Sequence, residues 1–80
     1  RAGVMIPLRP KEYVVLELLA VRKGRAVSRN DILEYGWDTL ETPGSNVEET
    51  IIASLRRKLG EPSLIKTVRG LGYQLDDAFD

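Results

Sequence analysis

The chain has 80 residues, enough for one domain with a modest hydrophobic core, and its twelve lysines and arginines balance twelve aspartates and glutamates. It contains no cysteine and no histidine, which excludes disulfides and thiolate chemistry and removes the usual general base and the commonest metal ligand. No apolar run is long enough to span a bilayer, so we expect no membrane partner.

The charges are uneven along the chain, because Asp76, Asp77 and Asp80 crowd the last five residues. Without these three aspartates, twelve basic residues face nine acidic ones. This surplus is modest beside the basic footprint that is typical of nucleic-acid-binding domains. We expect residues 76–80 to form a frayed tail. The first residue is Arg1 rather than methionine, and we expect the chain to be a piece of a longer protein.

The first predicted elements are a short strand at residues 4–6 and a helix over about residues 10–22, with proline at its first position. The apolar spacing places four residues on the buried face of this helix: Tyr13, Leu16, Leu19 and Ala20. Arg9 offers no acceptor at the N-cap, where a suitable residue is worth about 1 kcal/mol. We expect the charged first turn, Lys11 and Glu12, to be solvated.

A second helix is predicted after an extended link. Residues 25–27 (Arg-Ala-Val) are expected to be a short third strand beside a later hairpin. Ser28 and Asp31 are typical of a helix N-terminus, and this helix should run to about Tyr35. Residues 38–44 (Asp-Thr-Leu-Glu-Thr-Pro-Gly) form a loop by composition.

The third predicted helix, residues 46–59, has both ends marked. Ser45 can cap it, with Glu48 completing a capping box, and Gly60 can supply a left-handed stop. Its buried face comprises Val47, Ile51, Ile52, Leu55 and Leu59. Its outer face is small and polar: Asn46, Glu49, Thr50, Ala53, Ser54 and Arg57. The last turn, residues 56–58, is basic, which either the helix dipole or a role in phosphate binding would favour.

A β-hairpin is predicted over residues 65–75, with β-prone runs on both sides of a glycine-rich turn at residues 69–72. Arg69 should project from the tip, either as a solvated turn residue or as a contact in a minor groove. A helix followed at once by a hairpin with a cationic tip is the layout of a winged helix.

Five segments occur in a specific order: residues 8–13 (Leu-Arg-Pro-Lys-Glu-Tyr), 24–29 (Gly-Arg-Ala-Val-Ser-Arg), 45–47 (Ser-Asn-Val), 55–59 (Leu-Arg-Arg-Lys-Leu) and 66–73 (Lys-Thr-Val-Arg-Gly-Leu-Gly-Tyr). Together they resemble the C-terminal DNA-binding (effector) domain of OmpR/PhoB-type two-component response regulators. The resemblance covers about residues 6–75, and an ordered set of this kind is far more specific than one short motif.

The resemblance implies one α+β winged helix-turn-helix domain over residues 1–80, with three helices and a C-terminal hairpin wing. The family has a four-stranded sheet before the first helix, so residues 1–7 would be the remnant of that sheet. The implied function is sequence-specific binding of double-stranded promoter DNA, with recognition helix 46–59 in the major groove and wing 65–75 at the minor groove or backbone. The protein would be a cytoplasmic transcription regulator controlled by phosphorelay through a separate receiver domain.

The expected DNA contacts come from the outer face of the third helix, its basic last turn and the wing tip: Asn46, Glu49, Thr50, Ala53, Ser54, Arg56, Arg57, Lys58 and Arg69. The resemblance adds phosphate contacts from Trp37, Thr67 and Tyr73, although Trp37 and Tyr73 can also be read as core residues. It further implies that one loop contacts RNA polymerase: Asp38, Thr39, Leu40, Glu41, Thr42 and Pro43. The alternative is that this loop is a plain surface connection.

The third predicted helix departs from the family, many members of which carry arginine or histidine where this chain has Ile51, Ala53 and Ser54. Short side chains let a helix sit close in the groove, where Ala53 and the methyl group of Thr50 can pack on thymine methyls. Glu49 could accept a hydrogen bond from a cytosine amino group. We therefore expect an isolated, monomeric domain that binds one half-site of a direct repeat weakly.

Two classes of function remain open from the sequence. The first is the DNA-binding effector domain, and the second is a winged-helix protein-interaction module with little DNA affinity. Neither is an enzyme, because no acid/base pair, metal-ligand pattern or phosphate loop is present, and no cofactor is expected.

Overall fold

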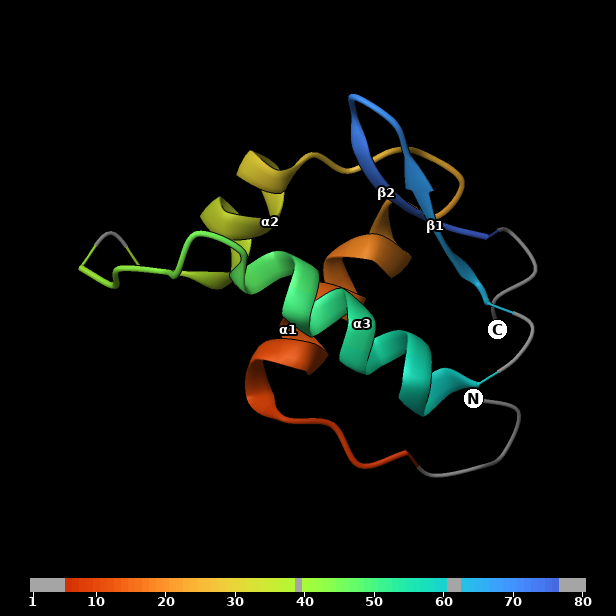
Figure 1. Ribbon diagram of the computed structural model, residues 1–80, viewed down its shortest axis with the longest axis horizontal. Helices are drawn as coiled ribbons and strands as arrows, with labels where there is room; N and C mark the ends of the chain where they lie inside the picture. The colour runs from red at the N-terminus through yellow and green to blue at the C-terminus, as the bar shows by residue number, and fades with distance from the viewer. Residues whose placement is uncertain (1–5, 39, 61–62, 77–80) are drawn as a thin grey trace.

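The computed structural model describes residues 6–38, 40–60 and 63–76. In chain order its elements are α1 (Pro10–Val21), α2 (Arg29–Gly36), α3 (Val47–Leu59), β1 (Ile65–Val68) and β2 (Gly72–Leu75). α1 contacts both other helices and β2, while the loop between α2 and α3 projects at the opposite end of the molecule from the hairpin (Figure 1). The predicted architecture of three helices with a C-terminal hairpin is confirmed.

The hairpin is antiparallel, with Ile65 paired to Leu75 at its base. Val27 adds one bridge to its edge: the Val27 N–H donates to the Tyr73 carbonyl over 2.7 Å, and the Tyr73 N–H donates back over 2.9 Å. The predicted third strand is therefore present as a single bridge. The backbones approach so closely that a Cβ on Gly72 would lie 2.0 Å from the Val27 carbonyl oxygen, so this position requires glycine.

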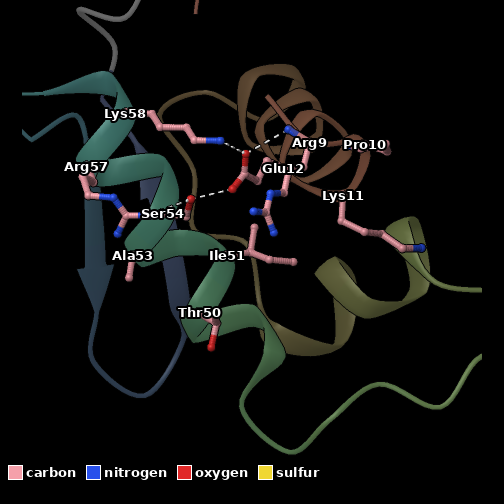
Figure 2. Close-up of a pocket in the computed structure, with 10 residues that line it drawn as sticks. All are labelled: Arg9, Pro10, Lys11, Glu12, Thr50, Ile51, Ala53, Ser54, Arg57 and Lys58. Atoms are coloured by element: carbon pink, nitrogen blue, oxygen red, sulfur yellow. Dashed lines mark hydrogen bonds and ion pairs between the residues drawn. The ribbon is translucent and has the colours of Figure 1, made fainter. Parts of the chain in front are cut away.

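The first turn of α1 is not the solvated segment that its charges predict, because Glu12 is only 5% exposed. Its Oε1 accepts from the Arg9 N–H over 2.9 Å and pairs with the Lys58 ammonium over 2.6 Å, while its Oε2 accepts from the Ser54 hydroxyl (Figure 2). The prediction was wrong because α3 supplies two of these partners, Ser54 and Lys58, which lie 42 and 46 residues later in the chain. The bond to the Arg9 N–H also satisfies one orphan donor of the uncapped helix.

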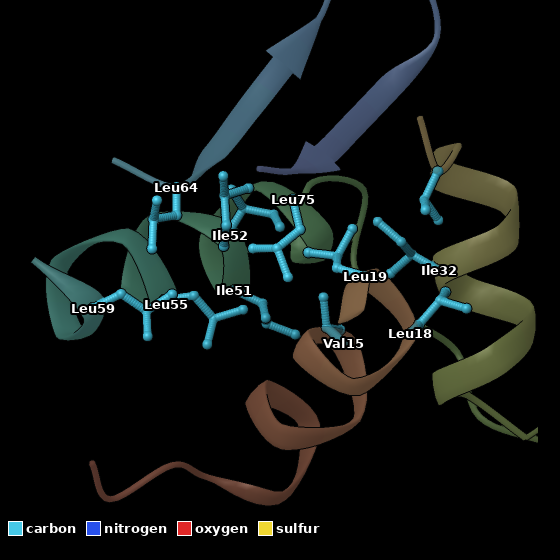
Figure 3. Packing of buried hydrophobic residues seen from close by; sticks show 12 residues of the cluster. Val15, Leu18, Leu19, Ile32, Ile51, Ile52, Leu55, Leu59, Leu64 and Leu75 are labelled. Carbon is cyan, nitrogen blue, oxygen red and sulfur yellow. The ribbon is translucent and has the colours of Figure 1, made fainter. Parts of the chain in front are cut away.

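The core joins all three helices and both strands (Figure 3). Its buried apolar residues are Val15, Leu18, Leu19, Val27, Ile32, Ile51, Ile52, Leu55, Leu59, Leu64, Ile65 and Leu75. Burying one large aliphatic side chain contributes about 1.5–3 kcal/mol, so α3 is held by this face and its opposite face is turned outward.

The buried face of α1 differs from the predicted one. Leu19 is buried as expected, but Val15 and Leu18 complete the face, and Tyr13 is 59% exposed. The reason is that apolar side chains surround α1 on nearly every side, with Glu17 the one exception after the first turn. A helix of this kind shows no periodicity from which a buried face can be chosen.

α2 is bounded nearly as predicted and ends at Gly36. The Ser28 hydroxyl accepts from the Asp31 N–H over 3.1 Å, which confirms the predicted cap. The carboxylate of Asp31 also pairs with Arg22 over 3.0 Å, so one acidic residue joins the start of α2 to the end of α1.

α3 begins at Val47, and the capping box predicted for it is not formed. Asn46 occupies the N-cap, and its side chain makes no capping bond. Arg29 of α2 instead binds both members of the predicted box, donating to the Ser45 carbonyl over 3.1 Å and to the Glu48 carboxylate over 3.0 Å. A long-range ion pair therefore replaces the local cap.

The two ends of the chain lie mostly outside the described residues. Of the strand predicted at residues 4–6, only the last residue is described, and it lies in no strand. Of the tail predicted at residues 76–80, only Asp76 is described, and its N–H donates to the Leu64 carbonyl over 2.8 Å, so Asp76 is not frayed. Within the described residues, none of the helices has the length and apolar character that crossing a membrane requires.

Candidate nucleic-acid interface

The outer face of α3 is open to solvent, as the sequence predicts. Its exposed residues are Asn46, Glu49, Thr50, Ala53 and Arg57. Ile52 and Leu55 on the opposite side are 1% and 0% exposed, so the predicted assignment of the two faces is confirmed. Ser54 is only half-exposed, because its hydroxyl is turned toward Glu12. The open part of the face is thus narrow and made of short side chains, which can approach the floor of a major groove.

Arg56, in the basic last turn, is directed at the hairpin. Its guanidinium donates to the Ile65 carbonyl over 3.0 Å and to the Thr67 hydroxyl over 2.8 Å. It also lies over the Tyr73 ring, 6.0 Å from the ring centroid. These contacts tie α3 to both strands of the hairpin, so the helix and the hairpin are held in one orientation.

Lys58, in the same turn, is directed at α1 through its pair with Glu12. The hydrogen bonds from Lys58, Ser54 and the Arg9 backbone lower the pKa of Glu12 from 4.5 to about 2, in that order of importance. The carboxylate is therefore ionised at neutral pH. Arg57 is the exposed cation of the turn and makes a 3.4 Å hydrogen bond to the Ser54 hydroxyl.

A groove of about 710 Å³ runs between the start of α1 and the outer face of α3. It is lined by Arg9, Pro10, Lys11, Glu12, Thr50, Ile51, Ala53, Ser54, Arg57 and Lys58. Figure 2 shows Glu12 between the two helices that form this groove. The lining holds four cations and one carboxylate, and Lys58 is paired with that carboxylate, so the groove keeps a net positive charge that favours an anionic partner such as a phosphate backbone.

The hairpin tip supplies the second part of the interface. Arg69 is exposed at the turn, and the following Gly70 has a φ of 77°, which glycine adopts freely. Tyr73 is half-exposed, and the pKa of its hydroxyl is raised by burial first and then by the nearby carboxylates of Glu48 and Glu49. The hydroxyl therefore stays protonated and can donate a hydrogen bond to an oxygen anion.

Trp37 follows α2 and is half-buried against the core, in agreement with its interpretation as a core residue. The Lys11 ammonium lies 4.7 Å from the centroid of its ring and also binds the Gly36 carbonyl and, over 3.2 Å, the Glu41 carboxylate. Lys11 was expected to be solvated, but it fastens the loop after α2 to α1. In that loop, Leu40 is 91% exposed.

The remaining residues of the predicted loop are mostly open to solvent, with Asp38, Glu41 and Thr42 exposed and Pro43 half-buried. Thr39 lies outside the described residues. In the part of the chain that is described, no group of three or more histidine, cysteine, aspartate or glutamate side chains could hold a metal ion.

Three residues that organise this surface were missed from the sequence: Lys11, Glu12 and Arg29. Each makes its decisive contacts with another helix or loop, so no pattern within its own segment indicates them. The one available signal is a charged residue at the edge of an apolar run, which usually indicates a solvated face.

Residues 3–75 of the chain match the family model described as "Transcriptional regulatory protein, C terminal". It is 45% identical over 75 residues to the transcriptional regulatory protein CutR of Streptomyces coelicolor, covering 94% of this chain and 35% of that protein. The chain therefore spans about a third of the length of the curated relatives that it matches.

Solved structures agree with the sequence comparison. The DNA-binding domain of CpxR from E. coli superimposes with a TM-score of 0.80 at 32% identity, covering 98% of this chain and 80% of that one. The DNA-binding domain of Klebsiella pneumoniae RstA, solved in complex with the RstA box, gives a TM-score of 0.73 at 28% identity, with 92% and 77% covered.

Proposed function

The chain belongs to the family of transcriptional regulatory protein C-terminal domains, and we propose that it binds double-stranded promoter DNA as the effector domain of a two-component response regulator. The family is one of transcriptional regulators and not of enzymes. The observation that carries the proposal is the exposed outer face of α3, held beside a hairpin whose tip presents Arg69. A helix for the major groove and a cationic wing for the adjacent backbone or minor groove are the two parts that winged-helix binding needs.

The base contacts in this proposal come from Asn46, Glu49, Thr50 and Ala53, with Ser54 at their edge. Ala53 and the Thr50 methyl would pack on thymine methyls, and Glu49 would accept from a cytosine amino group. In the described residues, no ion pair joins Glu49 to Arg57. The exposed carboxylate of Glu49 would therefore face the major groove of DNA unpaired and lower the affinity of the domain for the DNA phosphates. One half-site should therefore be bound weakly.

The backbone contacts in this proposal come from Arg57, Arg69, Trp37, Thr67 and Tyr73. Thr67 already accepts a hydrogen bond from Arg56, so its contact to a phosphate would use its own O–H as donor. In this proposal Arg56, which is hydrogen-bonded to the hairpin, and Lys58, which is paired with Glu12, do not reach DNA directly, although the sequence predicted both as contacts.

The partners of the full-length protein belong to the same proposal. A receiver domain would precede this domain and place two copies on directly repeated half-sites, which raises affinity by effective concentration, while the isolated domain would be monomeric. The projecting loop with its exposed Leu40 would contact RNA polymerase. In this proposal the full-length protein is a cytoplasmic regulator of transcription.

The test is to select bound sites from random duplex DNA with the chain and then to titrate salt on the selected site. We expect the logarithm of the binding constant to fall linearly with the logarithm of salt concentration, because phosphate contacts release counterions. A shuffled duplex of equal composition is the control and should bind more weakly. Equal binding to selected and shuffled duplexes would favour the protein-interaction module instead.

A further inference from the structure

The carboxylate of Glu12 is a junction between the start of α1 and the recognition helix. It is 5% exposed, and both of its oxygens are engaged. Oε1 pairs with Lys58 over 2.6 Å and accepts from the Arg9 N–H, and Oε2 accepts from the Ser54 hydroxyl. Ser54 in turn accepts a 3.4 Å hydrogen bond from Arg57 (Figure 2). The chain of contacts runs from a buried acid to an exposed cation.

The three cationic side chains at the end of α3 therefore differ in their contacts. Arg56 is bound to the hairpin, Lys58 is bound to Glu12 and is 27% exposed, and Arg57 is exposed on the outer face. A lysine that moved to a phosphate would leave a buried carboxylate without its counter-ion, and this is far more costly than breaking a solvated ion pair.

We propose that Glu12 is a positioning residue of the DNA interface, which withholds Lys58 from DNA phosphates and holds Ser54, so that Arg57 is the cation of this turn that meets the backbone. The proposal rests on the proposed function. It assigns a role in DNA binding to a residue that does not touch DNA. It also predicts that Lys58, although it lies in a basic turn, adds no phosphate contact.

The salt dependence of binding counts phosphate contacts and is insensitive to a simple loss of stability, because each neutralised phosphate contributes about 0.9 to the slope. Glu12→Gln keeps one carbonyl oxygen for the Arg9 N–H, and its amide N–H can donate to the Ser54 hydroxyl oxygen, but the substitution removes the charge that holds Lys58. Lys58 is then free to reach a phosphate. We expect the slope for Glu12→Gln to be steeper than that of the wild type by about one unit.

The experiment measures the slope for wild type, Glu12→Gln, Lys58→Ala and the double variant on the selected duplex. We expect Lys58→Ala to leave the slope unchanged and the double variant to return it to the wild-type value. Glu17→Gln is the matched control, because it removes an exposed carboxylate of α1 whose partner is the Tyr35 hydroxyl and not a cation. Its slope should equal that of the wild type.

Two results would overturn the inference while the proposed function stands. One is that the wild type binds DNA in a salt-dependent way but Glu12→Gln has the same slope, although a thermal melt shows that the variant is folded. The other is a Lys58→Ala slope about one unit shallower than wild type, which would mean that Lys58 already contacts a phosphate. Lys58→Ala serves as the test if Glu12→Gln does not fold. A wild-type chain without salt-dependent binding would contradict the proposed function and this inference together.

Discussion

The guanidinium of Arg56 on α3 lies 2.8 Å from the hydroxyl of Thr67 on β1, so the recognition helix and the wing are joined by a charged side chain that points away from the outer face. The same group donates to the Ile65 carbonyl over 3.0 Å. Hydrogen bonds from charged donors are worth about 1.5–3 kcal/mol each when they are shielded, and less at an exposed site. Besides the shared apolar core, Arg56 thus contributes polar contacts that fix the orientation of the wing relative to α3.

We predict that Arg56→Ala weakens DNA binding by releasing the wing. The measurement is a double-mutant cycle with Arg69→Ala: once the wing is loose, removing its tip arginine should cost less than it costs in the wild type. Arg22→Ala is the control, because it removes an ion pair to Asp31 that joins α1 to α2 and involves neither α3 nor the hairpin. The control should show no coupling to Arg69. Strict additivity of Arg56→Ala and Arg69→Ala would show that the wing is positioned independently of Arg56.

The wing tip gives a second prediction. Arg69→Ala should reduce affinity by about 1–3 kcal/mol if the side chain enters a groove, and by less if it only contacts a phosphate. Lys66→Ala is the matched control, since Lys66 is an exposed cation of the same hairpin that pairs with Asp76 at its base. Equal affinities of Arg69→Ala and wild type at low salt, with the fold intact, would mean that the tip makes no contact.

The two glycines of the hairpin turn differ in a way that thermal or urea unfolding can measure. A Cβ at Gly70 meets nothing within 4 Å, so Gly70→Ala should cost only the positive φ, about 1–2 kcal/mol. A Cβ at Gly72 would lie 2.0 Å from the Val27 carbonyl, so Gly72→Ala adds the cost of overpacking, about 1–3 kcal/mol, and breaks the bridge to Val27. Equal unfolding free energies for the two variants would contradict this account.

The depressed pKa of Glu12 makes part of the stability depend on pH. Its pKa is 4.5 in the absence of partners and about 2 in the fold, because Lys58 and Ser54 donate to the charged form. The unfolded chain therefore binds the proton first, so the stabilisation is complete above about pH 4.5 and is lost as the pH falls toward about 2.

The corresponding measurement is urea unfolding of wild type and Glu12→Gln between neutral pH and about pH 2. The difference in unfolding free energy should be constant near neutrality and should shrink across the acid range. Asp31 and Glu41 also have lowered pKa values, but they contribute equally to both proteins. A difference that stays constant down to about pH 2 would show that the folded protein does not hold Glu12 in its charged form.

Local features of the fold were predictable from the sequence, and long-range features were not. The Ser28 cap, the two faces of α3 and the hairpin turn each depend on neighbours within one segment, so spacing and turn chemistry indicate them. The buried face of α1 was not predictable, because its apolar side chains point in nearly all directions. The capping box predicted at the start of α3 was wrong, because the Glu48 carboxylate that would have formed it is hydrogen-bonded to Arg29, 19 residues away.

The candidate site divides in the same way. Exposure of Thr50, Ala53 and Arg69 follows from periodicity and turn position, and the structure agrees. The engagement of Lys58 with Glu12 could not be seen, because the two residues are 46 positions apart and each is ordinary within its own helix. In the sequence, the three cations of the last turn of α3 cannot be told apart. Their contacts differ only because the hairpin packs against one side of α3 and α1 packs against another.

The central claim is that the outer face of α3 meets DNA, and an added cation at Ala53 tests it most directly. Ala53 suits this test because it is exposed, whereas Ser54 is hydrogen-bonded to Glu12. The measurement is the salt slope of binding to the selected duplex for wild type, Ala53→Arg and Ala20→Arg. Ala20 is exposed on α1 and does not line the groove beside α3, so its variant carries the same added charge elsewhere.

We predict that Ala53→Arg binds more tightly and has a slope steeper by about one unit, while Ala20→Arg keeps the wild-type slope. If both variants keep the wild-type affinity and slope, the outer face of α3 does not meet DNA. A protein-interaction module would then replace the DNA-binding domain as the function of this chain.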